Sequence, residues 1–357
     1  MTNTPHSQMK KVVFLGDTLN TEEPLGIQRY ASEILRSLDT MELKYKCEVV
    51  IPSSDESHLY FEQIQVKQYG PKESNGFKWR QCYFPKYVKT QKAIGVDLTL
   101  GLCVLGTDVV CLHDCIHENY PDDFVGLKQK IKRYSYLLRS KRAIKNARRV
   151  ITVSIFSKKE IEEHYGIKNV AVVYDAWQHY ERITSDNSIL DKLDLRDKQF
   201  YFSLGSKLPH KNFKWIEEAA RQNPVSVFVV TGTKRFEKNS EKRELPNIIY
   251  TGFLNDSQVK ALMENCEAFI HPSLYEGFGI PPLEALASGA QILISKSTCL
   301  PEIYGASANY FDAGNYEHIN IEQLMKGSIS EVEISRTLER YSWEESARRL
   351  DEILNEL

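Results

Sequence analysis

The stretch FIHPSLYEGFGIPPLEALASGAQILISKSTCLPEIYG, residues 269–305, decides the fold that this sequence predicts. Residues 268–272 read as a short apolar strand that a proline stops, and a glycine-containing loop follows. Pro281 and Pro282 indicate the first turn of a helix, where a missing N–H loses no helical hydrogen bond. A glycine closes that helix, and the apolar run 291–295 reads as the next strand. Strand, glycine loop, helix and strand form the local unit of a parallel α/β sheet.

The loop of this stretch carries a candidate ligand site. Gly277 and Gly279 flank Phe278 just before the helix, where free N–H groups and the positive dipole end favour an anion. Glu276 and Glu284 are carboxylates that can accept hydrogen bonds from vicinal sugar hydroxyls. Because they do not share a helix face, they would contact two parts of one extended ligand. Alternatively, Glu284 is a solvated acid in the first turns, and the glycines form only a turn.

Glu276-x7-Glu284 within PSLYEGFGIPPLEALASG resembles the signature of retaining glycosyltransferases of family 4, and residues 295–305, SKSTCLPEIYG, match its continuation. A match of about 35 residues is far more specific than a lone glycine motif. The resemblance implies an α/β protein with the GT-B fold, in which two Rossmann-like domains with parallel sheets face each other. It also implies a C-terminal helix that packs back toward the N-domain. We expect an acceptor-side domain over residues 1–183, a nucleotide-sugar-binding domain over 184–340 and the final helix over 341–357.

The N-terminal part begins with an apolar strand, residues 11–16, followed by a loop and an amphipathic helix over 27–38. The loop resembles the family's acceptor-side Gly-Gly-x-x-x-Tyr motif, of which Gly26 keeps one glycine. No GxGxxG fingerprint follows the strand, which argues against a dinucleotide-dependent dehydrogenase.

Two further strands are expected over residues 97–103 and 108–112. If the second strand continued, Cys111, His113 and Cys115 would share one face. One interpretation of these three residues is therefore a metal site. No fourth ligand is spaced nearby, and the resemblance gives His113 another role, that of facing the donor sugar.

The second domain begins with a strand over residues 200–204, and the loop GSKLPHKN leads into a helix over 212–221. Lys211 in that loop is suited, as a point charge, to a diphosphate. The family usually has Arg-Lys-Asn where this chain has His-Lys-Asn, so the lysine carries over and the arginine does not. Lys207 is a candidate substitute. The alternative is that Lys211 is an ordinary solvated loop lysine.

The resemblance implies a role for each candidate residue. Glu284 would bind the ribose hydroxyls and Glu276 the transferred sugar, while His113 would cap that sugar from the opposite domain. The diphosphate would lie against Ser206 and Lys211. The remaining donor-side contacts would be Lys207, Gly277, Phe278, Gly279 and Ile280, and the acceptor-side contacts Gly26 and Asp114.

We therefore expect a retaining, metal-independent glycosyltransferase that needs no cofactor. It would move a hexose, with mannose favoured, from a GDP-, UDP- or dTDP-linked donor to a glycan or lipid-linked acceptor. Surface polysaccharide synthesis, including that of lipopolysaccharide, is the expected setting. Two alternatives stay open: a sugar-nucleotide epimerase or hydrolase on the same fold, and a non-catalytic subunit of a polysaccharide assembly complex.

Composition indicates the compartment. Seven scattered cysteines, an odd number, argue against a disulfide framework, and no apolar run approaches the length of a membrane span. We expect a cytoplasmic protein. Residues 126–149 hold ten basic residues and no acidic one, with apolar residues at roughly helical spacing: Ile131, Tyr134, Leu137, Leu138 and Ile144. Such a helix either is an ordinary surface helix or contacts an anionic lipid-linked acceptor or the inner face of an anionic membrane. Nucleic acid is not expected, because no recognition motif accompanies the charge.

Overall fold

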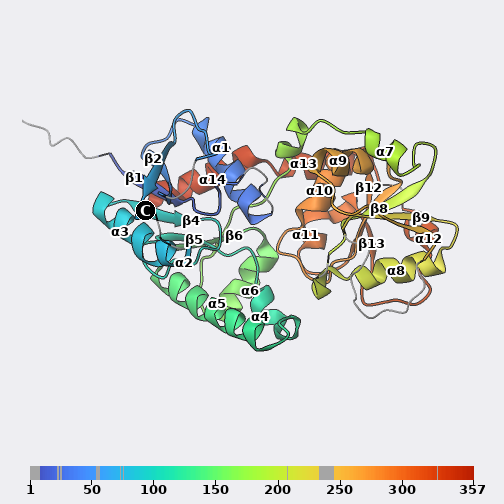
Figure 1. The fold of residues 1–357 in the computed structure, drawn as a ribbon, viewed down its shortest axis with the longest axis horizontal. Helices are drawn as coiled ribbons and strands as arrows, with labels where there is room; N and C mark the ends of the chain where they lie inside the picture. The colour runs from blue at the N-terminus through green and yellow to red at the C-terminus, as the bar shows by residue number, and fades with distance from the viewer. Residues whose placement is uncertain are drawn as a thin grey trace, which may run out of the picture. The chain divides into compact units, whose positions relative to one another are not determined.

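A computed structural model describes residues 9–21, 24, 26–53, 57–72, 74, 76–206, 208–232, 245–327 and 329–357. The chain divides into two compact units, each with its own parallel sheet (Figure 1). Unit 1 comprises Met1–Asp175 and Trp343–Leu357, and unit 2 comprises Ala176–Ser342.

Unit 1 contains, within its described residues, a seven-stranded parallel sheet in the order β3-β2-β1-β4-β5-β6-β7. Its strands are β1 (Lys11–Leu15), β2 (Lys46–Pro52), β3 (Gln65–Tyr69), β4 (Ile94–Asp97), β5 (Val109–Cys111), β6 (Arg149–Thr152) and β7 (Ala171–Val172). The central strands are apolar and buried, as expected for a parallel sheet covered on both faces.

The helices of unit 1 are α1 (Ile27–Asp39), α2 (Gly76–Lys78), α3 (Phe84–Gln91), α4 (Ile116–Asn119), α5 (Leu127–Asn146), α6 (Ile155–Tyr165) and α14 (Trp343–Glu356). A π-helix, Trp79–Tyr83, joins α2 to α3. The expected C-terminal helix is α14, which packs against α1 (Figure 1).

Unit 2 contains a six-stranded parallel sheet, again within the described residues, in the order β10-β9-β8-β11-β12-β13. Its strands are β8 (Phe200–Ser203), β9 (Val227–Val230), β10 (Ile248–Tyr250), β11 (Ala268–His271), β12 (Gln291–Ser295) and β13 (Asn309–Phe311). Its α-helices are α7 (Ser188–Lys192), α8 (Phe213–Gln222), α9 (Asp256–Asn265), α10 (Ile280–Ala287), α11 (Leu300–Tyr304), α12 (Ile321–Leu324) and α13 (Glu331–Arg340). Short 3-10 turns occupy Gln178–Arg182, Pro209–Lys211 and Gly305–Ser307.

One expected strand, over residues 97–103, is wrong. β4 ends at Asp97, and Leu100 and Leu102 have φ angles of 56° and 49°, which no strand can accommodate. The buried Asp97 carboxylate causes the turn, because it accepts hydrogen bonds from the N–H groups of Thr99, Gly101 and Leu102 at 2.7–3.1 Å. A carboxylate that accepts hydrogen bonds from the following backbone N–H groups gives them an alternative to the hydrogen bonds between strands.

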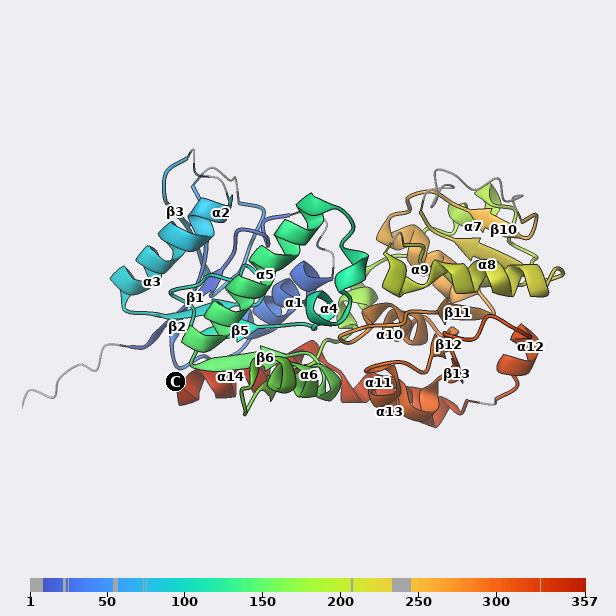
Figure 2. The ribbon, with the colours of Figure 1, turned by 90° about the horizontal axis from the view of Figure 1, so that it is seen from below.

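The expected basic helix exists as α5 (Figure 2). Its apolar residues do not all share one environment. Ala143 and Ile144 point inward and pack in a core cluster with Val110 and Leu112. Ile131 and Tyr134 lie on the outer side and are 59% and 65% exposed.

Candidate active site

The order of strands in unit 2 places the site. β8 lies between β9 and β11. The strands that follow β8 are added on one side of it, β9 and then β10, and the chain then returns to add β11 on the other side, so the strand order reverses between β8 and β11. Ligands of open α/β sheets bind outside the carboxyl ends of the strands at such a reversal. Lys211 follows β8 and Glu276 follows β11, so the fold brings these two predicted residues to that edge.

An ion pair joins them. The Lys211 ammonium lies 2.7 and 2.8 Å from the two carboxylate oxygens of Glu276. The Nε2 atom of His271, the last residue of β11, lies 2.8 Å from the Glu276 Oε1 atom. The side chain of Glu276 is 11% exposed and that of Lys211 is 30% exposed, so the carboxylate is the more deeply buried partner. His271 was not among the predicted site residues. Its position at the carboxyl end of a predicted strand is the sequence feature that could have indicated it.

The ion pair controls the charge of Glu276. Burial alone would raise the pKa of this carboxyl, because it penalises the charged form. The nearby Lys211 charge and the hydrogen bond from His271 outweigh burial, and the pKa lies well below its ordinary range. Glu276 is therefore ionised at physiological pH and can act only as a hydrogen-bond acceptor.

The second half of the sequence signature holds the first half in place. The backbone N–H of Glu276 donates to the Thr298 hydroxyl at 3.2 Å. The thiol of Cys299 contacts the carbonyl oxygens of Glu276 and Phe278 at 3.2 and 3.3 Å. The hydroxyl of Tyr304 donates to the Gly279 carbonyl. The loop that carries Glu276 is thus fixed by the segment that follows β12.

Gly279 cannot be replaced without strain. Its φ is 87°, and a Cβ atom there would lie 2.8 Å from Leu300 Cδ2. It precedes α10, whose second and third residues are prolines. Because proline has no N–H, only Ile280 and Leu283 among the first four residues of α10 can donate to an anion. Within the first turn of α10, the predicted backbone contact with phosphate is therefore limited to the N–H groups of Ile280 and Leu283.

Asn212 ties together the loops that carry Lys211 and Glu276. It is 4% exposed, has a φ of 54°, and its amide donates to the carbonyls of Pro272 and Ala313 at 3.2 and 2.9 Å. Its side-chain oxygen accepts from the Tyr316 hydroxyl at 2.8 Å. The sequence predicted only a helix start at Asn212, since the partners of its amide come from distant segments.

Glu284 makes a separate contact. Its Oε1 atom lies 2.8 Å from Nε2 of His179, which belongs to the turn Gln178–Arg182, and both side chains are buried. Glu284 is therefore not the solvated first-turn acid of the alternative interpretation, because it is 8% exposed. His179 was not predicted, and it orients the carboxylate.

The other predicted donor-side residues have structural contacts of their own. The Ser206 hydroxyl accepts from the Leu208 N–H at 3.2 Å. Phe278 is buried and meets the Tyr341 ring edge to face, with 5.3 Å between centroids. Lys207 lies outside the described residues, so its predicted role stays a prediction.

In unit 1, the predicted residues lie at the carboxyl ends of β1 and β5. His113 is buried, and its Nε2 lies 3.0 Å from the carbonyl oxygen of Leu98. Its ring meets the Tyr30 ring edge to face, with 4.8 Å between the ring centroids. Since a carbonyl only accepts, Nε2 carries the hydrogen and Nδ1 is the acceptor of the neutral ring. Asp114 accepts from the Ile116 N–H at 3.0 Å, and Gly26 precedes α1 with a φ of 41°.

The condition for aligning Cys111, His113 and Cys115 on one face is not met, because β5 ends at Cys111. Over the described ranges of the chain, no group of three or more His, Cys, Asp or Glu side chains is placed to hold a metal ion.

The buried His113 should make the stability of unit 1 depend on pH. Burial lowers the pKa of His113 to about 4, although the hydrogen bond to Leu98 acts in the opposite direction. The unfolded chain binds a proton near pH 6.5 and the folded chain does not, so stability is lost as pH falls from 7 toward 4. We expect a loss of about 2 kcal/mol between pH 7 and 5 from this residue. Denaturant unfolding of the His113→Gln variant should lack that part of the pH dependence.

The exposed His58 supplies the control. His58→Gln should unfold with the wild-type pH dependence. Equal pH dependence in wild type and His113→Gln would show that His113 already titrates normally in the folded protein.

Family models match both parts of the chain. The model described as Glycosyltransferase Family 4 matches residues 25–176, and the model described as Glycosyl transferases group 1 matches residues 186–341. Together they span most of both units.

Curated relatives match shorter regions. The serotype-specific mannosyltransferase WbdA of Escherichia coli is 30% identical over 174 residues, which is 45% of this chain and 21% of that protein. The O-antigen chain mannosyltransferase RfbU of Salmonella typhimurium is 26% identical over 236 residues, 62% of each chain. The chain thus matches about a fifth of WbdA and about three fifths of RfbU.

Solved structures share the fold over almost the whole length. Sucrose-phosphate synthase of Thermosynechococcus elongatus superposes with a TM-score of 0.72 at 13% identity, covering 97% of this chain and 98% of that one. Anabaena HepE, in complex with UDP and glucose, gives 0.65 at 18% identity and covers 98% and 100%. With two Rossmann-like sheets, a C-terminal helix on unit 1 and both family models matched, this chain is a member of glycosyltransferase family 4 with the GT-B fold.

Proposed function

We propose that this protein transfers a hexosyl residue, with mannose favoured, from a nucleoside-diphosphate donor to a glycan or lipid-linked acceptor with retention. One observation carries the proposal: the buried Lys211–Glu276–His271 cluster beside the N-terminus of α10, at the strand reversal of unit 2. The names of the curated relatives, mannosyltransferases of surface polysaccharides, favour mannose as the sugar.

The cluster suits the departure of a nucleoside diphosphate. Negative charge grows on the leaving oxygen in the transition state, and the Lys211 ammonium with the N–H groups of Ile280 and Leu283 would stabilise it. The ionised Glu276 would accept hydrogen bonds from the hydroxyls of the sugar. The oriented Glu284 would do the same for the ribose. The departing phosphate would take the proton of the acceptor hydroxyl, and His113, as a neutral ring, would contact the sugar.

A donor panel tests the proposal. GDP-, UDP- and dTDP-sugars are incubated with and without glycan and lipid-linked acceptors, and nucleoside diphosphate release and the anomeric configuration of the product are measured. Acceptor-dependent release with retained configuration is the expected result. Release that ignores the acceptor, or an isomerised sugar, would instead identify the hydrolase or epimerase alternative. No turnover with any donor that binds would favour a non-catalytic subunit.

We further propose that α5 docks on an anionic lipid surface. Leu127, Ile131, Tyr134 and Leu138 are 77%, 59%, 65% and 36% exposed. Their spacing of four, three and four residues places them on one face of the helix. That face is opposite the one that packs on the sheet, so the stripe is not part of the core.

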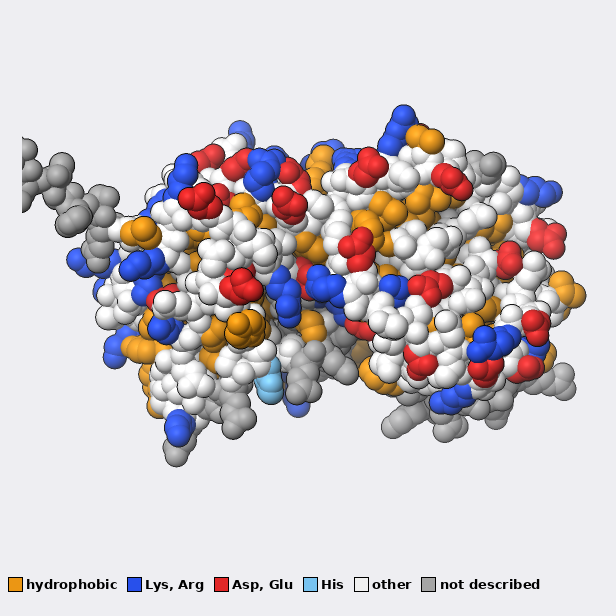
Figure 3. All heavy atoms as spheres, turned by 90° about the horizontal axis from the view of Figure 1, so that it is seen from above, with side chains coloured by type: hydrophobic (Ala, Val, Ile, Leu, Met, Phe, Trp, Pro, Cys, Tyr) orange, Lys and Arg blue, Asp and Glu red, His pale blue; other side chains and the backbone are white. Residues whose placement is uncertain are grey.

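Charge identifies the occupant of this face. Ten basic and no acidic residues lie in 126–149, whereas the face of unit 1 drawn in Figure 3 has acidic and basic side chains interspersed. Each Lys or Arg near an anionic membrane contributes about 1 kcal/mol of binding, and the apolar stripe would enter the headgroup region. No helix in the described ranges is long and apolar enough to cross a bilayer. Docking at the inner face of a membrane would place the enzyme beside lipid-linked acceptors.

Vesicle sedimentation tests the docking. Wild-type protein should sediment with phosphatidylglycerol-containing vesicles, not with pure phosphatidylcholine vesicles, and salt should release it. Ile131→Ser/Tyr134→Ser/Leu138→Ser should lose most of this binding, as should reversal of Lys128, Lys130, Lys132 and Arg133 to glutamate. Both variants should retain activity on a short soluble acceptor.

A matched control reverses four exposed lysines elsewhere in unit 1: Lys44, Lys46, Lys86 and Lys89. This control should sediment like wild type. If it loses binding as completely as the α5 reversal does, net charge and not α5 is responsible, and the docking proposal fails.

A further inference from the structure

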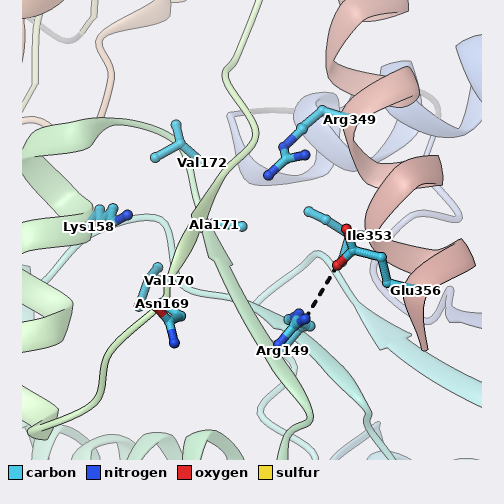
Figure 4. Close-up of a pocket in the computed structure, with 9 residues that line it drawn as sticks. All are labelled: Arg149, Lys158, Asn169, Val170, Ala171, Val172, Arg349, Ile353 and Glu356. Atoms are coloured by element: carbon cyan, nitrogen blue, oxygen red, sulfur yellow. Dashed lines mark hydrogen bonds and ion pairs between the residues drawn. The ribbon is translucent and has the colours of Figure 1, made fainter.

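A cavity of about 350 Å³ lies in unit 1 beside the edge strand β7 (Figure 4). We call it the β7 pocket. Arg149 is the first residue of β6, and Asn169 comes just before β7, so the pocket adjoins the amino ends of these strands. Gly26 and His113 follow the carboxyl ends of β1 and β5. Because the strands are parallel, the pocket and those residues lie at opposite edges of the sheet.

Three cations from three elements line the pocket: Arg149 of β6, Lys158 of α6 and Arg349 of α14 (Figure 4). Two of them are paired. Glu356 lies 3.3 Å from Arg149, and Glu352 lies 2.9 Å from Arg349.

The third cation has no such partner. The ammonium of Lys158 has no hydrogen-bond or ion-pair partner anywhere in the described ranges of the chain. The pocket therefore keeps an excess of positive charge. Glu356 is 57% exposed and can turn into solvent, which would free Arg149 for another anion.

The remaining wall is largely apolar. Val170, Ala171, Val172 and Ile353 contribute it. Val170 and Ile353 are only 1% and 2% exposed, so the apolar surface that a ligand can reach belongs mainly to the half-buried Ala171 and Val172. A cavity of this volume, in which cations from three elements converge beside a small apolar surface, has the size of a site for a small molecule.

We propose that the β7 pocket binds a small phosphate monoester with a compact apolar body. Guanidinium groups match phosphate oxygens in a bidentate geometry, and a phosphate monoester carries nearly two negative charges at neutral pH. The ester displaces Glu356 from Arg149, contacts Lys158 and Arg349, and places its apolar body against Ala171 and Val172 of β7. The bound ester thereby links α14 to β6 and α6. α14 is the part of unit 1 that follows unit 2 in the sequence.

Calorimetric titration of the full chain with phenyl phosphate at low ionic strength tests this site. We expect one phenyl phosphate per chain at the β7 pocket, in addition to any bound at the proposed donor site, bound more tightly than inorganic phosphate, and no binding of benzyl alcohol. Lys158→Gln/Arg349→Gln should weaken binding at least tenfold. Glu356→Gln should strengthen binding several-fold, because the competing carboxylate is gone. The exposed Lys89→Gln is the control: if binding were nonspecific attraction to surface cations, Lys89→Gln would change it as much as these variants do.

The proposed donor site would also take a phosphate, so Lys211→Met, which should weaken binding there alone, separates the two sites. This variant should bind phenyl phosphate like wild type. Loss of binding at the β7 pocket by folded Lys211→Met protein, unchanged binding in Lys158→Gln/Arg349→Gln, or no binding by folded wild-type protein would each overturn the proposal. None of these results bears on whether the protein transfers sugar, because no residue that lines the pocket is a candidate catalytic residue.

Discussion

Replacing Glu276 by glutamine should reduce kcat/KM with the cognate donor by at least one to two decades. The amide still fills the space, but the change removes the charge that orients Lys211 and the carboxylate that we propose as an acceptor for the sugar hydroxyls. Losing a hydrogen bond to a charged group costs about 1.5–3 kcal/mol, which corresponds to that loss in rate. Steady-state assay of nucleoside diphosphate release measures the effect.

Glu276→Gln should remain folded, because Lys211 is 30% exposed and can turn toward water. Glu322, an exposed glutamate of α12, provides the matched control, and Glu322→Gln should keep wild-type activity. Near-wild-type turnover by a folded Glu276→Gln protein would remove Glu276 from the active site.

Replacing Lys211 by methionine should damage both stability and catalysis, and its cost in stability should exceed that of Glu276→Gln. The reason is the difference in burial. Glu276, with a side chain 11% exposed, would be left buried without its lysine, and removing one partner of a buried pair costs about 3–5 kcal/mol. Lys211 is partly solvated, so solvent reduces that figure for the actual pair. Denaturant unfolding of the two single variants and the double variant measures the coupling.

The acid limb of the stability curve gives a second measurement. In wild type, the lowered pKa of Glu276 stabilises the fold above the unfolded value near 4.5, and this contribution is lost as pH falls through the folded value. Without Lys211 the pKa of Glu276 should rise, so less stability should be lost on acidification. Donor and nucleoside diphosphate affinity should fall more than nucleoside monophosphate affinity, since the lysine would face the β-phosphate.

Lys192, an exposed lysine of α7, gives the control Lys192→Met, which should match wild type in both measurements. A Lys211→Met variant that is less destabilised than Glu276→Gln would contradict the order of burial on which this expectation rests. Equal losses of mono- and diphosphate affinity would place Lys211 away from the β-phosphate.

The sequence by itself determined the fold class and the central loop of unit 2. The run from residue 269 to 305 is local: its strand, glycine turn, double proline and next strand each follow from residue types within a few positions. β11, α10 and β12 therefore lie close to where the sequence predicts them. The positive φ of Gly279 is also a local requirement for glycine, whereas the crowding of its Cβ position comes from Leu300, which only the tertiary structure brings there.

Tertiary structure alone decided which side chains meet. The partners of Glu276 include Lys211, which is 65 residues away, and Glu284 meets His179 across 105 residues. No periodicity encodes such contacts, because they arise only when parallel strands bring distant loops to one edge of the sheet. The two faces of α5 were also undecided by spacing. An apolar residue at helical spacing fits a core or an exposed stripe equally well, and only packing on the sheet shows that Ile144 is buried while Ile131 is exposed.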